Sequence, residues 1–217
     1  ERLENTIIEM ASEADLPLIG PNCMGLYHPK AGMRMTRDQL YGENGVFAFI
    51  SQSGTTSMSL SNIAPAHGLK VSKGISFGNG ISVDCTDLLE YLADDEDTEF
   101  IGMYLEGVRD GRRFFEALRS ASQKKPVLVW KVGQSEEGSK AGQSHTGSKP
   151  ISEAMWSALL RQCGAVKVEN TQEMIDTAII LQKMSIVGER VALLTVGGGH
   201  AGKIADVFGQ KGFVIPS

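Results

Sequence analysis

From residue 45 onward, short apolar runs alternate with longer stretches in which apolar residues recur on one helical face. The apolar runs have the length of buried strands, and they occupy residues 46–50, 69–77, 100–105, 126–132 and 165–168. The stretches with helical period lie between them, over residues 56–66, 84–92, 111–122, 152–163 and 171–184. Strands that alternate with helices of about three turns are typical of βαβ units. We therefore predict a doubly wound α/β fold of the flavodoxin-like type, with a parallel sheet covered on both faces by helices.

Both flanks of this region predict parts of other α/β domains. Residues 1–15 have the pattern of a charged helix and residues 16–21 that of a short apolar strand, whereas residues 27–44 have no clear period. Residues 191–215 repeat the order of strand, glycine-rich turn and helix seen at 46–66. We expect three parts: the end of a Rossmann-like domain with its connector at 1–40, the flavodoxin-like domain at 41–186, and the start of a second flavodoxin-like domain at 187–217. The incomplete patterns at both ends indicate a longer parent protein.

His145 stands in a long segment of small and polar residues, from 133 to 149, between a predicted strand and a predicted helix. Loops of that length are uncommon inside compact domains and are usually functional. A histidine beside Ser144, Thr146 and Gly147 is not a packed core residue, and the pattern suits a histidine that acts as a nucleophile or proton carrier. A solvated surface histidine is the alternative that this segment alone leaves open.

Two turns between a strand and a helix predict anion sites. Ser53, Gly54 and Thr55 open the first predicted helix of the regular region, where unpaired N–H groups and the helix dipole favour negative charge. An ordinary helix cap is the alternative there. Residues 197–203 have the glycine and lysine spacing of a phosphate-binding loop, but Ile204 stands where a hydroxyl should coordinate Mg²⁺. We reject an NTPase there and keep a second glycine-lined helix N-terminus, which could hold the same anion from the opposite side.

Glu106 directly follows the apolar run 100–105 and precedes Gly107. A carboxylate at the carboxyl edge of a sheet can orient an imidazole and stabilise its charged form, although a solvated loop acid fits the same position. Ligands of open α/β sheets bind outside the carboxyl ends of the strands. We therefore expect Glu106, the histidine segment and the turns at 51–55 and 78–80 to converge on one edge.

Composition excludes several classes of protein. A formal net charge of −5 argues against a nucleic-acid partner, which would need a basic stripe. No apolar run approaches the roughly 18 residues of a membrane span, so we expect no membrane partner. The cysteines, Cys23, Cys85 and Cys163, are odd in number and far apart, which fits neither a disulfide framework nor a zinc cluster. We predict no metal site in this chain and a cytoplasmic protein.

Six short motifs resemble the nucleoside-diphosphate-forming (NDP-forming) acyl-CoA synthetases, a family that includes ADP-forming acetyl-CoA synthetase and, more distantly, the α subunit of succinyl-CoA synthetase. In family order they are residues 18–25 (LIGPNCMG), 51–54 (SQSG), 87–92 (DLLEYL), 104–107 (YLEG), 125–127 (KPV) and 144–147 (SHTG). They cover almost the whole chain, and together they are far more specific than any one of them.

The resemblance implies a role for each candidate residue. His145 is similar to the histidine that is transiently phosphorylated, and Glu106 to the acid that holds it. Two helix N-termini would cradle the phosphoryl group, formed by Ser53, Gly54 and Thr55 and by Gly198, Gly199 and His200. Asn22 and Cys23 resemble the end of the CoA-binding Rossmann-like domain, near the arriving thiol, and Gly78 and Asn79 would line the acyl pocket.

The implied reaction is that of an acid–CoA ligase. Acyl-CoA and phosphate give acyl phosphate and CoA, His145 takes the phosphoryl group, and the group then passes to ADP. The nucleotide and its Mg²⁺ would bind an ATP-grasp domain or subunit outside this chain, and we expect an oligomer. Lys149-Pro150 depart from the small residues usual after the SHTG motif. The alternative function is a non-catalytic, ligand-sensing domain of a protein lysine acetyltransferase, and the presence of both His145 and Glu106 favours the enzyme.

Overall fold

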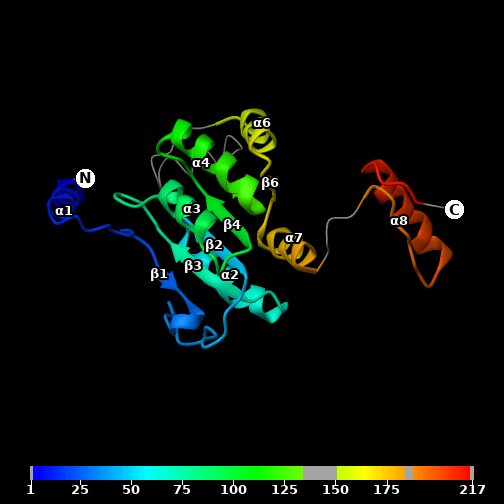
Figure 1. The fold of residues 1–217 in the computed structure, drawn as a ribbon, viewed down its shortest axis with the longest axis horizontal. Helices are drawn as coiled ribbons and strands as arrows, with labels where there is room; N and C mark the ends of the chain where they lie inside the picture. The colour runs from blue at the N-terminus through cyan, green and yellow to red at the C-terminus, as the bar shows by residue number, and fades with distance from the viewer. Residues whose placement is uncertain (1, 134–150, 184–187, 216–217) are drawn as a thin grey trace. The chain divides into compact units, whose positions relative to one another are not determined.

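The computed structural model describes residues 2–133, 151–183 and 188–215, and Figure 1 traces them from the N-terminus to the C-terminus. The chain forms two compact units, Glu1–Ile179 and Ile180–Ser217. The first unit carries the sheet. The second is built around one helix, α8 (Gly198–Gln210).

Six strands form one sheet within the described residues. They are β1 (Gly25–Tyr27), β2 (Phe47–Ser51), β3 (Val71–Ser76), β4 (Phe100–Leu105), β5 (Val127–Lys131) and β6 (Val166–Lys167). Their order is β1-β3-β2-β4-β5-β6, and β1 pairs antiparallel with β3, whereas the other neighbours are parallel. The five parallel strands therefore follow the flavodoxin-like order 2-1-3-4-5. The predicted fold class is confirmed.

Several of the helices that precede α8 begin at a residue whose side chain caps the first turn. Their bounds are α1 (Arg2–Glu13), the short 3₁₀ turn η1 (Pro29–Ala31), α2 (Gly54–Ala66), α3 (Cys85–Asp94), α4 (Gly111–Lys124), α6 (Glu153–Cys163) and α7 (Thr171–Lys183). The side chains that accept a hydrogen bond from a first-turn N–H group include Ser53, Asp84, Asp110, Ser152 and Asn170. Each cap satisfies a donor that the helix leaves unpaired. In the part of the chain that the structure describes, no helix has both the length and the apolar character needed to cross a membrane.

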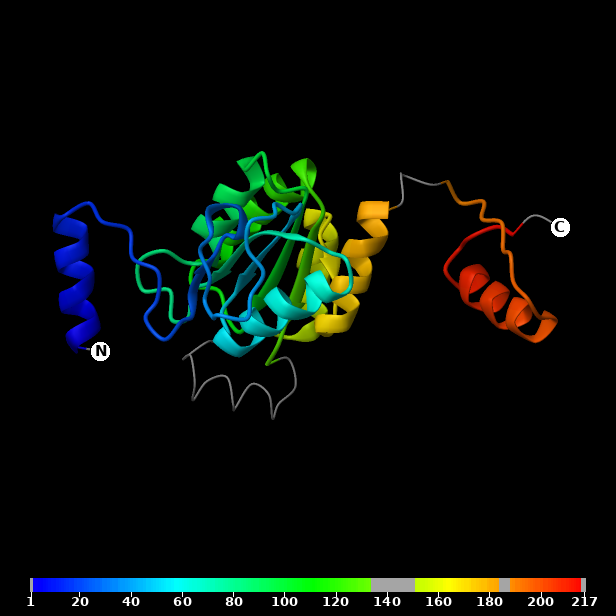
Figure 2. The same ribbon diagram turned by 90° about the horizontal axis from the view of Figure 1, so that it is seen from below.

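Helices cover both faces of the sheet (Figures 1 and 2). One face packs against α3, α4 and α6 in the main hydrophobic core, and α2 and α7 cover the other face. The centre of β4 shows why a glycine stands there. A Cβ on Gly102 would lie 2.8 Å from both the Met174 sulfur of α7 and the Phe47 ring of β2. Without a side chain, Gly102 lets α7 approach the sheet closely.

Two predicted strands are absent. Residues 16–21 form no strand and instead run beside the loop after β3, where the Ile81 and Val83 N–H groups donate to the carbonyls of Gly20 and Leu18. Residues 191–196 also form no strand, and the nearest pairing is a single bridge between Arg190 and Val214. A strand needs a neighbour that supplies a ladder of hydrogen bonds, and apolar character alone does not provide one.

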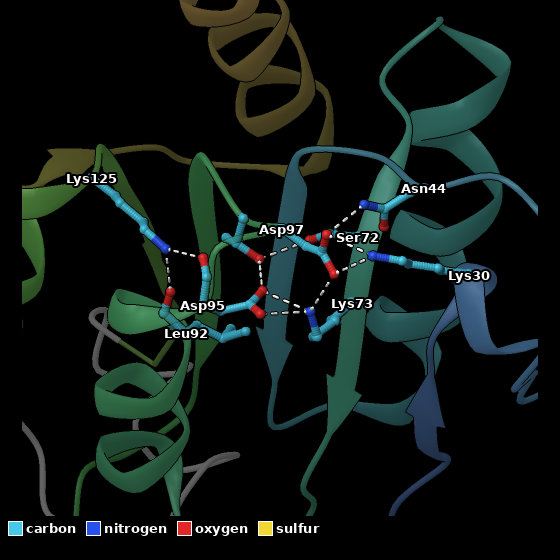
Figure 3. A network of polar contacts seen from close by, with 9 residues as sticks. Lys30, Asn44, Ser72, Lys73, Leu92, Asp95, Asp97 and Lys125 are labelled. Atoms are coloured by element: carbon cyan, nitrogen blue, oxygen red, sulfur yellow. Dashed lines mark hydrogen bonds and ion pairs between the residues drawn. The ribbon is translucent and has the colours of Figure 1, made fainter.

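A network of polar side chains lies at the amino edge of the sheet (Figure 3). Lys73 of β3, only 8% exposed, donates to both carboxylate oxygens of Asp95 at 2.8 and 2.7 Å. The Thr98 hydroxyl donates to the same carboxylate at 2.5 Å. Burial opposes ionisation of Asp95, but the hydrogen bonds from Lys73 and Thr98 outweigh it and hold the Asp95 pKa below its usual range. Lys125 donates to the main-chain carbonyls of Leu92 and Asp95. The network therefore ties the loop between α3 and β4 to both β3 and the start of β5.

Candidate functional site at the carboxyl edge of the sheet

The turn from β2 into α2 is the first part of the candidate site. The Ser51 hydroxyl donates to the Ser53 carbonyl at 2.7 Å, and the Ser53 hydroxyl accepts from the Thr56 N–H group at 3.2 Å. The first turn of α2 contains no acidic residue. The N–H groups of Gly54 and Thr55 open the helix at the point where the helix dipole is positive. This end of α2 is therefore suited to bind an anion such as a phosphoryl group.

Glu106 emerges from β4 directly beside that turn. Ser51 of β2 pairs with Tyr104 of β4, and the Gln52 N–H group continues the pairing by donating to the Tyr104 carbonyl at 3.1 Å. The side-chain oxygen of Gln52 then accepts from the N–H groups of Glu106 and Gly107 at 2.9 and 3.1 Å. Gln52 thus binds the start of the α2 turn to the peptide that carries the candidate acid.

Lys131, the last residue of β5, approaches Glu106 from the other neighbouring strand. It is 8% exposed, and its ammonium donates to the main-chain carbonyl of Glu106 at 2.9 Å and to that of Val132. Burial lowers the Lys131 pKa, and the charge of Glu106 partly opposes that shift. A positive charge therefore lies next to the candidate acid.

Tyr104 contributes a neutral hydroxyl to this region. Burial, followed by the charge of Glu106, raises the Tyr104 pKa to about 12, while a hydrogen bond with the Thr56 side chain acts in the opposite sense. The ring packs edge-on against Trp130, with centroids 4.8 Å apart. Tyr104 is consequently protonated at neutral pH and joins β4 to the first turn of α2.

The segment that contains Asn22 and Cys23 is another part of the candidate site. The Met24 N–H group donates to the Ser76 hydroxyl of β3 at 3.0 Å. A Cβ on Gly54 would lie 2.9 Å from the Met24 side chain, so the segment also contacts the start of α2. Gly78, after β3, has φ +57, and a Cβ there would lie 2.2 Å from the Pro21 carbonyl oxygen and 2.3 Å from that of Asn22. Only glycine allows the two backbones to approach this closely.

These contacts bring together the predicted site residues of the first unit. The carboxyl edge gathers Asn22, Cys23, Ser53, Gly54, Thr55, Gly78, Asn79 and Glu106. In the second unit, Gly198, Gly199 and His200 form the first turn of α8, whose cap residue Gly197 supplies no side-chain hydrogen bond. His145 lies outside the described residues. The roles assigned to all of these residues stay predictions.

Gln52 and Lys131 are not among the site residues predicted from the sequence. A signal for Lys131 was available, because a lysine that ends a buried strand must have partners for its charge. Gln52 lies inside a motif that was noted for its hydroxyls and glycine, and nothing local in the sequence indicates that its side chain reaches across to Glu106.

The family follows from comparison of this region with known proteins. Residues 44–181 match the family described as "Succinyl-CoA ligase like flavodoxin domain". The chain belongs to the NDP-forming acyl-CoA synthetase family. The resemblance drawn from the six sequence motifs is confirmed, and the matched residues contain the whole parallel sheet.

Relatives within the family match nearly all of the chain. It is 38% identical to the ADP-forming acetate–CoA ligase I of Archaeoglobus fulgidus over 97% of its length, and 36% identical to the α subunit of the ADP-forming acetate–CoA ligase II of Pyrococcus furiosus over 99%. The acetyl-coenzyme A synthetase 1 of Ca. Korarchaeum cryptofilum, solved in complex with phosphate and ADP, superposes with a TM-score of 0.90 at 32% identity over 99% of the chain. The chain spans 31%, 47% and 47% of these three proteins.

Proposed function

We propose that this chain is the phosphohistidine-bearing part of an ADP-forming acyl-CoA synthetase. The complete enzyme would interconvert acyl-CoA, phosphate and ADP with a carboxylic acid, CoA and ATP. Family membership supports this proposal, because the relatives named above are acetate–CoA ligases and an acetyl-coenzyme A synthetase. The observation that carries it is local: Gln52 holds the Glu106 peptide against the turn that opens α2. An acid and an anion-binding helix end thus share one edge of the sheet.

The proposed reaction has three steps. A phosphate oxygen attacks the thioester carbonyl carbon, the C–S bond breaks, and CoA leaves as acyl phosphate forms. An imidazole nitrogen of His145 then attacks the phosphorus, and the P–O bond to the acyl group breaks to release the carboxylate. An oxygen of ADP finally displaces the imidazole and forms ATP.

The residues of this chain would serve these steps mainly by positioning and charge stabilisation. The N-terminus of α2, at Ser53, Gly54 and Thr55, would hold the phosphoryl group. Glu106 would orient the His145 imidazole and stabilise its charged form. Asn22 and Cys23 would lie near the CoA thiol, and Gly78 and Asn79 near the acyl group.

The remaining parts of the enzyme are proposed by the same reasoning. We assign residues 1–40 to the end of a CoA-binding domain, 41–186 to the ligase domain and 187–217 to the start of a second ligase domain, with α8 as the second phosphoryl cradle. An ATP-grasp domain or subunit would bind ADP and Mg²⁺, which would offset the charge of the nucleotide phosphates. One relative, the P. furiosus protein, is named as a subunit, which fits an assembly of several parts.

Intact mass spectrometry of the complete parent protein, with its nucleotide-binding partner, tests the proposal after incubation with ATP and Mg²⁺. We expect the gain of one acid-labile phosphoryl group, which is absent from His145→Ala. If the wild-type protein gains no phosphoryl group with partner and Mg²⁺ confirmed present, the catalytic proposal fails and a ligand-sensing role replaces it.

A further inference from the structure

The peptide groups of Glu106 are held by side chains from both neighbouring strands. On the β2 side, the Gln52 oxygen accepts from the Glu106 N–H group at 2.9 Å. On the β5 side, the Lys131 ammonium donates to the Glu106 carbonyl at 2.9 Å. Glu106 is the first residue beyond β4, where the regular ladder of main-chain hydrogen bonds ends. The side chains of Gln52 and Lys131 therefore restrain the backbone for one residue beyond the strand, at the proposed orienting acid.

A lysine is unusual at position 131, the buried end of β5. Val127 and Val129, which share its face of β5, are fully buried, and an apolar side chain would continue that pattern. A buried ammonium is unfavourable unless it is well bonded, and Lys131 meets this condition through two carbonyls, those of Glu106 and Val132. Its Nζ atom therefore joins the backbone just beyond β4 to the backbone just beyond β5.

We infer that Gln52 and Lys131 are positioning residues, which fix the Glu106 backbone from two sides and thereby set the direction of its carboxylate. This inference rests on the proposed function, in which Glu106 orients the phosphorylated histidine. A loosely held acid would sample many directions, and catalytic groups lose efficiency when their supporting contacts are removed. Lys131 also places a positive charge next to the proposed acid.

Lys125 provides a matched control for Lys131. Both lysines adjoin β5, one just before it and one at its end, and each ammonium donates to two main-chain carbonyls. Burial lowers the pKa of both. Lys125 bonds the carbonyls of Leu92 and Asp95 at the amino edge, so Lys125→Met removes the same kind of contact without touching Glu106.

The first experiment measures the single-turnover rate at which the complete enzyme is phosphorylated by ATP. We expect Lys131→Met and Gln52→Met each to lower this rate about 10- to 100-fold, the range known for hydrogen-bonding partners that orient metal ligands. Lys131→Arg should recover most of the rate, and Lys125→Met should leave it unchanged. In a Glu106→Gln background, Lys131→Met should cause no further loss. Equal rates for Lys131→Met and wild type, or a full additional loss in the Glu106→Gln background, would overturn the inference.

Amide hydrogen exchange tests the positioning independently of activity. We expect faster exchange at Glu106 and Gly107 in Gln52→Met and Lys131→Met, but not in Lys125→Met. If the wild-type enzyme forms no phosphohistidine yet these amides respond as expected, the proposed function fails while the positioning stands. If the amides of both variants exchange like those of the wild type, the positioning itself is wrong.

Discussion

The two edges of the sheet use buried lysines in opposite ways. At the amino edge, Lys73 contacts the carboxylate of Asp95 (Figure 3). The Thr98 hydroxyl donates to the same carboxylate. At the carboxyl edge, Lys131 contacts main-chain carbonyls instead, and one of them belongs to Glu106. The two lysines are equally buried, at 8% exposure. At one edge a cation neutralises an acid, whereas at the other a cation fixes the backbone that carries an acid.

This difference separates stability from function. A carboxylate bonded to a buried lysine and a hydroxyl contributes to folding but is poorly placed to act on a ligand. A carboxylate whose backbone is restrained keeps its position, and in the proposed reaction it acts on His145. We therefore expect substitutions at the amino edge to lower the free energy of unfolding, and substitutions at the carboxyl edge to lower the rate of phosphoryl transfer.

The largest effect is expected for Glu106→Gln. The amide has the same shape but no charge, so it neither orients nor stabilises a charged imidazole in the same way. The single-turnover rate of phosphorylation should fall about 10³- to 10⁴-fold, as for other acids that orient a catalytic histidine. The variant should still fold, because the Glu106 backbone contacts with Gln52 and Lys131 remain. A rate within threefold of wild type would remove Glu106 from the mechanism.

Lys73→Met should have the largest effect on stability. Lys73 and Asp95 have side-chain exposures of 10% and 12%, and removing one partner of such a buried pair costs about 3 kcal/mol. Urea denaturation measures this loss, and the phosphorylation rate of the folded variant should equal that of wild type. A variant with normal stability but a reduced rate would reverse the proposed division between the two edges.

The same pair predicts a pH dependence. Because the Asp95 pKa is lowered in the folded protein, its contribution to stability is present above the usual aspartate pKa and is lost as the pH falls through the lowered value. Lys73→Met should therefore flatten the acid limb of the stability curve. Urea denaturation at a series of acidic pH values checks this, and an unchanged acid limb would mean that Lys73 does not set the Asp95 pKa.

Lys131→Arg should change how the phosphorylation rate falls at alkaline pH. Burial lowers the Lys131 pKa, so its ammonium is lost at a lower pH than that of an exposed lysine. Below this lowered pKa, burying the charged Lys131 ammonium lowers the free energy of unfolding. This destabilisation decreases as the pH rises through the lowered pKa. For activity, the loss of charge next to Glu106 should lower the rate over the same window. An arginine stays charged there, so the fall in the rate should move to higher pH. The phosphorylation rates of wild type and Lys131→Arg, measured from neutral to alkaline pH, test this expectation. If both rates fall over the same pH range, the charge of Lys131 does not contribute to the rate.

The sequence predicted the elements whose pattern is local. The run at 100–105 has the bounds of β4, because apolar residues lie between charged residues on both sides, and the position of Glu106 at a strand end follows from it. β1 was not predicted, since it is three residues long and exists only through its pairing with β3. The roles inferred for Gln52 and Lys131 depend on which strands are neighbours. That information comes from tertiary packing, and a single sequence does not contain it locally.

The smallest effects are expected at Ser53, where capping and anion binding can be separated. Ser53→Ala removes the hydroxyl that accepts from the Thr56 N–H group and should lower the free energy of unfolding by about 1 kcal/mol. Ser53→Asp restores a good cap, so stability should return to the wild-type value. Its carboxylate would repel a phosphoryl group at the same helix end, and the phosphorylation rate should fall below that of Ser53→Ala. If Ser53→Asp is instead both stable and fully active, the N-terminus of α2 serves only as a helix cap, and the carboxyl edge binds its phosphoryl group elsewhere.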